Sequence, residues 1–427
     1  MTHQYAEFLY DKPYDFRDHI KFYFRQQQKN NHRVAQDYLH DLVRPRLRIV
    51  IVTETWPPEI NGVALSLLQL CKGLQQLGHK ILLIRPEQQQ RCTEFVPYKE
   101  CLVKAQAIPK YPSLQFGWPQ FLKVSQALAD FNPNVVHIVT EGPLGLSALH
   151  AAKAKNIPIS SGFHSPFQDF SRFFDLAFLL KPIQRYLRWF HNSTQLTCVP
   201  SVDTERALRQ FGVTCPLLVV GRGVDIQRFS PKHRSESLRQ CWGADADTTV
   251  MLYVGRLSPE KEIEVIIETF HTLRLQQKKV QLVIVGEGPD LGRLKQIPGA
   301  EQAIFTGGLR GETLATAYAS ADVFVFASQV ETFGNVVLEA MASGLAVVAY
   351  NYASAQQYVV QHQTGWLSTR GDRAGFTQTL MNLPNRRVLR QMGILAVQAT
   401  QHAGWQHPVH QLEQALYLVA KEHEVST

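Results

Sequence analysis

Residues 323–344 read VFVFASQVETFGNVVLEAMASG, and this stretch decides the fold. VFVFAS is a short apolar run typical of a buried strand, and a loop then leads into an apolar pattern with helical spacing. A strand that is apolar on both faces and passes into a helix is typical of a parallel sheet covered by helices. The stretch also carries two carboxylates, Glu331 in the loop and Glu339 inside the helix, so the loop is a candidate binding site.

The same alternation of strands and helices occurs in two series along the chain. The first series of apolar runs covers 46–54, 80–86, 135–140, 158–163, 195–201 and 216–224, and the second covers 249–255, 280–286, 302–308, 323–328 and 345–350. A polar stretch at 225–248 separates them and is predicted to be a linker with an edge helix. We therefore expect an α/β protein with two Rossmann-like doubly wound domains. Ligands of such sheets bind beyond the carboxyl ends of the strands, so a cleft between the domains is the expected site.

Length and composition agree with a soluble protein of two domains. The chain has 427 residues, and one hydrophobic core usually organises about 250–300. Hydrophobic residues make up 45% and charged residues 19%. No apolar run reaches the roughly 18 residues of a spanning helix, and the first residues do not resemble a secretory signal. The six cysteines lack CxxC or metal-ligand spacing and are expected to be free thiols in a reducing cytoplasm: Cys71, Cys92, Cys101, Cys198, Cys215 and Cys241.

The net charge of +8 favours a partner that carries negative charge, such as phosphates, nucleic acid or an anionic membrane. No basic run interleaved with aromatics resembles an RNA-binding platform, so nucleic acid is not expected. Residues 172–190, RFFDLAFLLKPIQRYLRWF, allow two interpretations. A core helix interrupted by Pro182 is favoured, and a basic amphipathic face on anionic lipid is the alternative.

The loop that follows residues 323–328 has features of a phosphate site. Backbone N–H groups at a helix start near Gly334 or Asn335 would hold an anion at the positive end of the helix. Gly334 permits close approach because it lacks a Cβ. Glu339, about one turn into the helix, could accept hydrogen bonds from ribose hydroxyls, and Glu331 would face whatever lies beyond the phosphates. The alternative is a capping carboxylate and a surface glutamate.

Three other strand ends carry candidate site residues. In VGRLSPEK (254–261), Arg256 and Lys261 flank a Ser-Pro turn, and this pair of cations suits a diphosphate. In PPEINGV, Gly62 lies in a turn that enters a helix. His164 follows a strand and could polarise a hydroxyl or support developing charge. Taken singly, each could be an ordinary surface or structural residue.

Two apparent signals are weak. Asp245 and Asp247 have the DxD spacing of a metal-binding sugar transferase, but they precede a strand instead of ending one, so a turn is expected. GEGPD (286–290) is only a fragment of GxGxxG, and no GxxxxGK[ST] phosphate loop is present. The sequence therefore predicts no metal site.

Four segments together resemble glycosyltransferase family 4, whose members are retaining enzymes of the GT-B fold: VGRLSPEK, ETFGNVVLEAMASG, GRGVD (221–225) and FTGGLRGETLATAYASADVFVFAS (305–328). The resemblance covers residues 47–425. The motifs ETFGNVVLEAMASG and GRGVD are most similar to those of GDP-mannose-dependent α-mannosyltransferases. It implies an N-terminal extension at 1–46, an acceptor domain at 47–228 and a nucleotide-sugar domain at 229–405. A C-terminal helix within 406–427 would return to the N-terminal domain.

The resemblance also implies roles for residues. Arg256 and Lys261 would bind the donor diphosphate, Glu331 the transferred sugar and Glu339 the ribose. Gly62 would line the loop facing donor and acceptor, and His164 would approach the sugar. The remaining donor contacts would come from Phe333, Gly334, Asn335 and Val336 beside the phosphate and sugar, and from Gly308 and Leu309 beside the nucleobase. The chemistry would thus fall to His164, Glu331, Arg256 and Lys261. The family commonly has Gly after the lysine, whereas this chain has Glu262, which puts the local turn geometry in question.

The implied activity is metal-independent, cofactor-free transfer of a hexose with retained anomeric configuration. The donor would be GDP-mannose, or else UDP-glucose or a related UDP-sugar, and the acceptor a lipid-linked or cell-envelope glycan. The enzyme would be cytoplasmic and peripheral at the inner face of the cytoplasmic membrane. The alternatives are a GT-B nucleotide-sugar epimerase and a non-catalytic nucleotide-sugar-binding protein. The sequence leaves the oligomeric state open.

Overall fold

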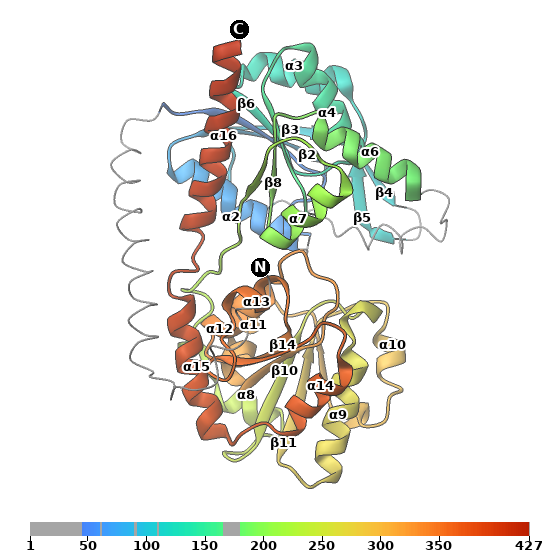
Figure 1. Cartoon of the computed structure of the whole chain (residues 1–427), viewed down its shortest axis with the longest axis vertical. Helices are drawn as coiled ribbons and strands as arrows, with labels where there is room; N and C mark the ends of the chain where they lie inside the picture. The colour runs from blue at the N-terminus through green and yellow to red at the C-terminus, as the bar shows by residue number, and fades with distance from the viewer. Residues whose placement is uncertain (1–44, 60–61, 89–91, 109–110, 165–179, 427) are drawn as a thin grey trace, which may run out of the picture. The chain divides into compact units, whose positions relative to one another are not determined.

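The computed structural model of the chain describes residues 45–59, 62–88, 92–108, 111–164 and 180–426. The chain divides into two units, Met1–Arg46 and Leu47–Thr427, and the architecture below is that of the second unit. Within the described residues, no helix is both long enough and apolar enough to cross a bilayer. The second unit contains two separate parallel sheets, each with its own helices (Figure 1).

The first sheet has seven parallel strands in the order β3-β2-β1-β6-β7-β8-β9. Their bounds are β1 Arg48–Val52, β2 Lys80–Pro86, β3 Lys99–Val103, β6 Val135–Ile138, β7 Ile159–Gly162, β8 Leu196–Val199 and β9 Leu217–Val219. A separate antiparallel pair, β4 (Ala105–Ile108) and β5 (Tyr111–Gly117), follows β3. Apolar side chains occupy both faces of the central strand β1, as expected for a sheet covered on both sides.

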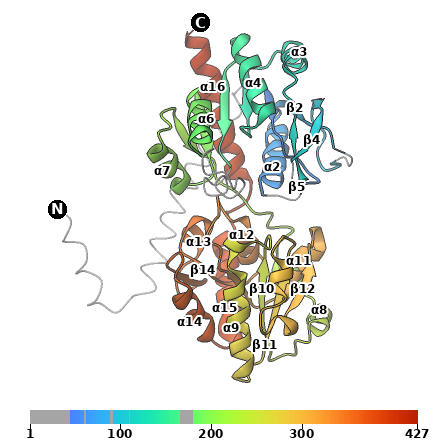
Figure 2. The same cartoon turned by 90° about the vertical axis from the view of Figure 1, so that its right-hand side faces the viewer.

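Helices cover both faces of the first sheet. Alternate residues of β1 point to opposite faces. Ile49 and Ile51 pack with α2 (Gly62–Gln76) and α16 (Gln406–Ser426), whereas Val50 and Val52 face the other core. That second face is covered by α3 (Phe121–Phe131), α4 (Pro143–Ala154) and α6 (Leu180–Asn192), which follow one another across the sheet (Figure 2). Helix α7 (Val202–Phe211) packs beside β8 and β9.

The second sheet has six parallel strands in the order β12-β11-β10-β13-β14-β15. Their bounds are β10 Thr249–Val254, β11 Val280–Val285, β12 Ile304–Gly307, β13 Val323–Phe326, β14 Ala346–Tyr350 and β15 Gly365–Ser368. The associated helices are α8 Glu236–Cys241, α9 Ile263–Leu275, α10 Leu291–Leu294, α11 Gly311–Ser320, α12 Asn335–Ala342, α13 Ala353–Tyr358, α14 Arg373–Met381 and α15 Arg386–Thr400. Short 3-10 turns lie at η2 Pro231–His233, η3 Pro259–Lys261 and η4 Ala300–Gln302. One continuous core joins this sheet to its helices.

Each strand that the sequence predicts is present, but β3, β4, β5 and β15 were missed. β3 and β15 lie at the edges of their sheets, where fewer side chains are buried and polar residues are tolerated. Their sequences, KECLV and GWLS, therefore lack the continuous apolar runs of the central strands.

The predicted interruption of a helix at Pro182 stays a prediction, because the structure describes this segment only from Leu180 onward. The described part of helix α6 runs from Leu180 to Asn192 and includes Pro182. Residues 172–179 of that prediction lie outside the described residues. Leu187 and Phe190 are buried, whereas Lys181, Arg185 and Arg188 are exposed. The helix thus has both a core face and a basic outer face.

The polar stretch at 225–248 contains a helix, as predicted, and this helix, α8, is packed into the second core. Arg239 of α8 is fully buried, and its Nη1 donates to the Asp322 carboxylate at 2.9 Å. The same carboxylate group accepts from Val250 N at 2.9 Å and from Arg386 Nε at 2.9 Å. Asp322 therefore ties α8, β10 and α15 together.

We expect Asp322→Ala to destabilise the second half of the chain by about 3–5 kcal/mol, because it removes the buried counter-charge of Arg239 and leaves only the exposed Glu236, at 3.5 Å. The measurement is denaturant unfolding followed by circular dichroism. Glu236→Gln is the matched control, since Glu236 pairs with Arg234 and Arg239 from the surface. A loss of stability in Asp322→Ala no larger than that in the control would contradict the prediction.

Candidate functional site

Lys261 and Glu331, which the sequence placed in one site, are in contact. Lys261 ends the turn η3 after β10, and its buried Nζ donates to Glu331 Oε1 at 2.5 Å. The same ammonium donates to Val330 O at 3.0 Å and Ser328 Oγ at 3.2 Å. Ser328 Oγ in turn donates to Glu331 Oε1 at 3.0 Å. The loops after β10 and β13 therefore meet around one cation.

Arg256 leaves the same strand end as Lys261. Its half-exposed guanidinium donates from Nη2 to Glu260 Oε1 at 3.1 Å. Ser258 Oγ donates to that same oxygen at 2.6 Å, and Tyr253 OH donates to Arg256 O at 3.0 Å. Glu260 thus holds the arginine from one side, and the exposed side of the guanidinium can contact a ligand.

Glu262 explains how the turn after Lys261 forms without glycine. Its φ of +46° lies in the left-handed region that favours glycine. The buried Glu262 carboxylate accepts from Gln329 Nε2 at 2.5 Å, Tyr350 OH at 2.7 Å and Arg373 Nε at 2.8 Å. The turn therefore keeps a glycine-like conformation, and three side-chain hydrogen bonds offset the strain of a side chain at this φ.

Helix α12 begins as the sequence predicted, at Asn335 with Gly334 before it. Gly334 has φ of +83°, and a Cβ there would lie 3.1 Å from Ser354 Oγ. Ser354 Oγ donates to Gly334 O at 2.7 Å and so fixes the turn. The first N–H groups of a helix have no partner within it and form its positive end. Asn335 and Val336 supply that first turn, while the Phe333 side chain is buried in the core.

Glu339 is half-buried in the second turn of α12, and Tyr318 OH donates to its Oε2 at 2.9 Å. Burial raises the pKa of Glu339 to about 7. The described hydrogen bonds of the Glu331 carboxylate come from Lys261 and Ser328, so Glu331 is not a capping carboxylate. The alternative stated above, in which Glu331 is a capping carboxylate and Glu339 a surface glutamate, is therefore wrong.

Gly308 and Leu309 follow β12, next to a loop that the sequence analysis discounted. Gly308 N donates to Glu287 Oε1 at 3.3 Å, and Leu309 packs against the core. A Cβ on Gly286 would lie 1.8 Å from Gly255 O, so the GEGPD loop needs glycine to lie against the loop after β10. Glu287 thus lies next to the predicted nucleobase site and was not predicted. The pattern that could have indicated it is the Gly-X-Gly directly after a strand.

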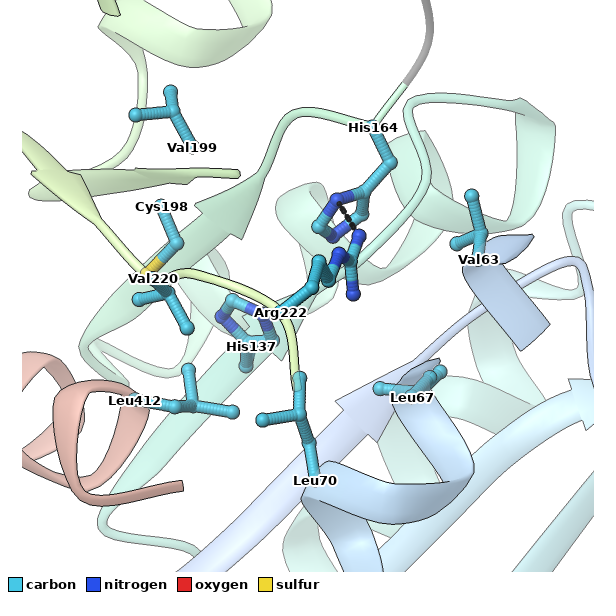
Figure 3. A pocket seen from close by; sticks show the side chains of 10 residues that line it. All are labelled: Val63, Leu67, Leu70, His137, His164, Cys198, Val199, Val220, Arg222 and Leu412. Carbon is cyan, nitrogen blue, oxygen red and sulfur yellow. Dashed lines mark hydrogen bonds between the residues drawn. The ribbon is translucent and has the colours of Figure 1, made fainter. Parts of the chain in front are cut away.

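In the first half, His164 lies just beyond β7 and contacts Arg222 of the GRGVD segment (Figure 3). Its Nδ1 accepts from Arg222 Nη2 at 2.9 Å. Burial, and secondarily the Arg222 charge, lowers the pKa of His164 well below its usual value. Gly62 begins α2 and has open space on its Cβ side. From the sequence, Arg222 was identified only as part of the GRGVD motif.

Glu54, directly after β1, is another residue that the sequence analysis missed. It accepts from Leu144 N at 2.9 Å, at the start of α4, and from Gly117 N at 3.3 Å. Burial raises the pKa of Glu54 to about 7. The sequence pattern that could have indicated Glu54 is a carboxylate just after a buried strand. Several other apolar strands are also followed by polar residues, so this pattern does not single out Glu54.

The DxD segment forms a turn, as predicted. The Asp245 carboxylate accepts from Asp247 N at 2.9 Å and from Thr248 N at 2.8 Å. Across the described residues, no group of three His, Cys, Asp or Glu side chains has the arrangement of a metal site.

Comparisons with known proteins agree with this architecture. The model of the family "Glycosyltransferase Family 4" matches residues 60–228, and that of "Glycosyl transferases group 1" matches residues 234–392. The GDP-mannose-dependent alpha-mannosyltransferase of Mycobacterium tuberculosis is 34% identical over 332 residues, which cover 76% of this chain and 85% of that protein. The alpha-monoglucosyldiacylglycerol synthase of Streptococcus pneumoniae is 26% identical and covers 71% of each chain.

Among solved structures, the Anabaena protein HepE in complex with UDP and glucose superimposes with a TM-score of 0.68 at 21% identity. The match covers 87% of this chain and all of that one. Two parallel sheets with this order, the two family matches and a relative at 34% identity lead to one conclusion. The chain belongs to glycosyltransferase family 4 and has the GT-B fold.

Proposed function

We propose that the protein is a retaining glycosyltransferase that transfers a hexose from a nucleoside-diphosphate sugar, first of all GDP-mannose, to a lipid-linked or cell-envelope glycan acceptor. The observation that supports it best is the contact between Lys261 and Glu331 at the carboxyl ends of β10 and β13. It brings an ammonium group and a carboxylate together at strand ends, and such sheets bind ligands at the carboxyl ends of their strands.

The donor would lie along the second sheet's carboxyl edge. Arg256 and Lys261 would contact the diphosphate, together with the first-turn amides of α12. Glu331, already oriented by Lys261, would accept from hydroxyls of the sugar. Glu339, with Tyr318 on one oxygen, would accept from the ribose with the other. GDP-mannose is the first choice because the relative at 34% identity is named for it.

In the transfer step, the bond from the anomeric carbon to the diphosphate oxygen would break while the acceptor oxygen bonds to that carbon on the same face. The acceptor proton would pass to the leaving diphosphate oxygen. The Arg256 and Lys261 cations would stabilise the negative charge that develops there, which is usually the largest electrostatic contribution. His164, kept neutral, would approach the sugar. We propose that no metal is needed, so that activity persists in EDTA.

The acceptor proposal rests on a relative's name and on α6. The pneumococcal relative is named a synthase of alpha-monoglucosyldiacylglycerol, which is a lipid. The exposed face of α6 carries Lys181, Arg185 and Arg188, together with Trp189, whose exposed fraction is 44%. Cations beside an exposed Trp suit the surface of an anionic membrane. We therefore propose a peripheral enzyme at the inner face of the cytoplasmic membrane.

The test is a donor panel. The purified protein is incubated with GDP-mannose, UDP-glucose or UDP-galactose, with and without lipid acceptors and in EDTA, and the products are read by mass spectrometry. We expect a glycosylated acceptor from one donor only. Isomerised donor without acceptor would indicate an epimerase, and donor binding without turnover would indicate a sensor; either result would overturn the proposal.

In the same assay, we expect Lys261→Met to lower kcat/KM for the donor by at least about a hundredfold, because one cation leaves the diphosphate site. Lys279→Met is the matched control, since Lys279 is an exposed lysine of the same half that pairs with Asp245. Donor kinetics in Lys261→Met equal to those of the control would refute the diphosphate assignment.

Glu339 should make donor binding depend on pH. Below a pKa of about 7 its carboxyl is protonated and loses an acceptor, so the KM for the donor should rise as the pH falls from 8 to 6. Glu339→Gln should show a KM about tenfold higher at pH 8 and little pH dependence. Glu312→Gln on the exposed surface of α11 is the control. A variant whose KM keeps the wild-type pH profile would exclude this role.

Reversing the charge of Lys181, Arg185 and Arg188 to Glu should reduce co-sedimentation with phosphatidylglycerol liposomes about tenfold. Added salt should weaken wild-type binding because it screens exposed charges. The control reverses three exposed cations elsewhere, Lys232, Lys278 and Arg206. Equal losses in the two triple variants would show that net charge, and not α6, governs binding.

A further inference from the structure

Arg222 is a buried guanidinium that lacks a carboxylate partner among the described residues. Its exposed fraction is 6%, and its Nη2 donates a hydrogen bond to His164 Nδ1. Other buried arginines here follow the usual rule that a buried charge is paired. Arg239 donates to the Asp322 carboxylate at 2.9 Å, and Arg85 donates to Glu100 Oε1 at 2.9 Å.

None of the neighbours of Arg222 that the structure describes supplies a negative charge. His164 is an imidazole that accepts at Nδ1, so it is neutral and carries its proton on Nε2. Burial lowers the pKa of His137 to about 4, and its Nδ1 pairs with Ser160 Oγ at 2.9 Å. An uncompensated buried charge costs several kcal/mol. Retaining one inside the first half therefore needs an explanation.

The guanidinium borders a small hollow. Figure 3 shows Arg222 and the His164 ring beside each other, with Val63 and Leu67 of α2 across from them. The residues that line this hollow include no carboxylate: Val63, Leu67, Leu70, His137, His164, Cys198, Val199, Val220, Arg222 and Leu412. Val63 belongs to the first turn of α2, the positive end of a 15-residue helix.

We propose that Arg222, oriented by His164 and facing the first turn of α2, forms an oxyanion-binding subsite for a phosphoryl, sulfonyl or carboxyl group of a substrate. The substrate's negative charge would compensate the guanidinium when it binds. The subsite belongs to the first half of the chain and is distinct from the Lys261 region. Only the statement that the oxyanion belongs to a transferase substrate rests on the proposed function.

The test titrates pyrophosphate and sulfate into the full-length protein by calorimetry, in a Lys261→Met background that weakens the other candidate anion site. We expect Arg222→Met to bind the probe anions at least about tenfold more weakly. Arg206→Met, which removes an exposed arginine of the same half, should bind within about twofold of the parent. Equal affinity in Arg222→Met and Arg206→Met would overturn the subsite.

A thermal melt without added anions separates binding from a structural role. Removing an uncompensated buried charge should leave Arg222→Met at least as stable as the parent. A lower melting temperature, or failure to fold, would assign Arg222 a structural role and overturn the proposal. Arg222→Lys keeps the charge but loses the planar fork, so it should bind the anions with intermediate affinity.

Steady-state kinetics identify the source of the oxyanion. A higher KM for the acceptor in Arg222→Lys would locate it on the acceptor, and a higher KM for the donor would locate it on the nucleotide sugar. Unchanged values of both would overturn the assignment to a substrate. If no donor supports transfer at all, the proposed function fails, while the calorimetric titration still decides whether the subsite exists.

Discussion

The candidate site in the second half of the chain depends on the position of one ammonium group. Lys261 Nζ contacts Glu331, Val330 and Ser328, so the loops after β10 and β13 are fixed against each other at the sheet's carboxyl edge. A buried lysine with a carboxylate and two neutral acceptors is compensated in charge and in hydrogen bonds. The same contact orients Glu331 beside the start of α12, where a bound phosphate would gain most from the helix end.

The turn that carries Lys261 is held from behind by Glu262. A side chain at φ of +46° is strained, and here it is stabilised by Gln329, Tyr350 and Arg373, which come from the loop after β13, from β14 and from α14. A glycine would adopt the turn without strain but would lose these bonds. The chain has therefore exchanged conformational freedom for a network that fixes the lysine loop to three elements of its own sheet.

Arg222 differs from the other buried cations described above in what surrounds its charge. In the second half, Asp322 compensates Arg239, and Glu331 compensates Lys261. In the first half, Arg222 meets the neutral ring of His164. That histidine cannot act as a counter-ion, but it fixes where the guanidinium points. The first arrangement is a property of the folded chain by itself, whereas the second is best understood together with a charged ligand.

The sequence alone determined the two series of buried strands, the turn at Gly334 and the loop positions of Arg256, Lys261 and Glu331, because apolar periodicity and glycine act locally. It could not determine edge strands such as β15, which are too polar to differ from loops. Only the tertiary structure showed three hydrogen bonds. Lys261 donates to Glu331, Tyr318 donates to Glu339, and Arg222 donates to His164. These pairs join residues at least 21 positions apart, and hydrogen bonds over such separations depend on how strands are ordered within a sheet, which no local pattern records.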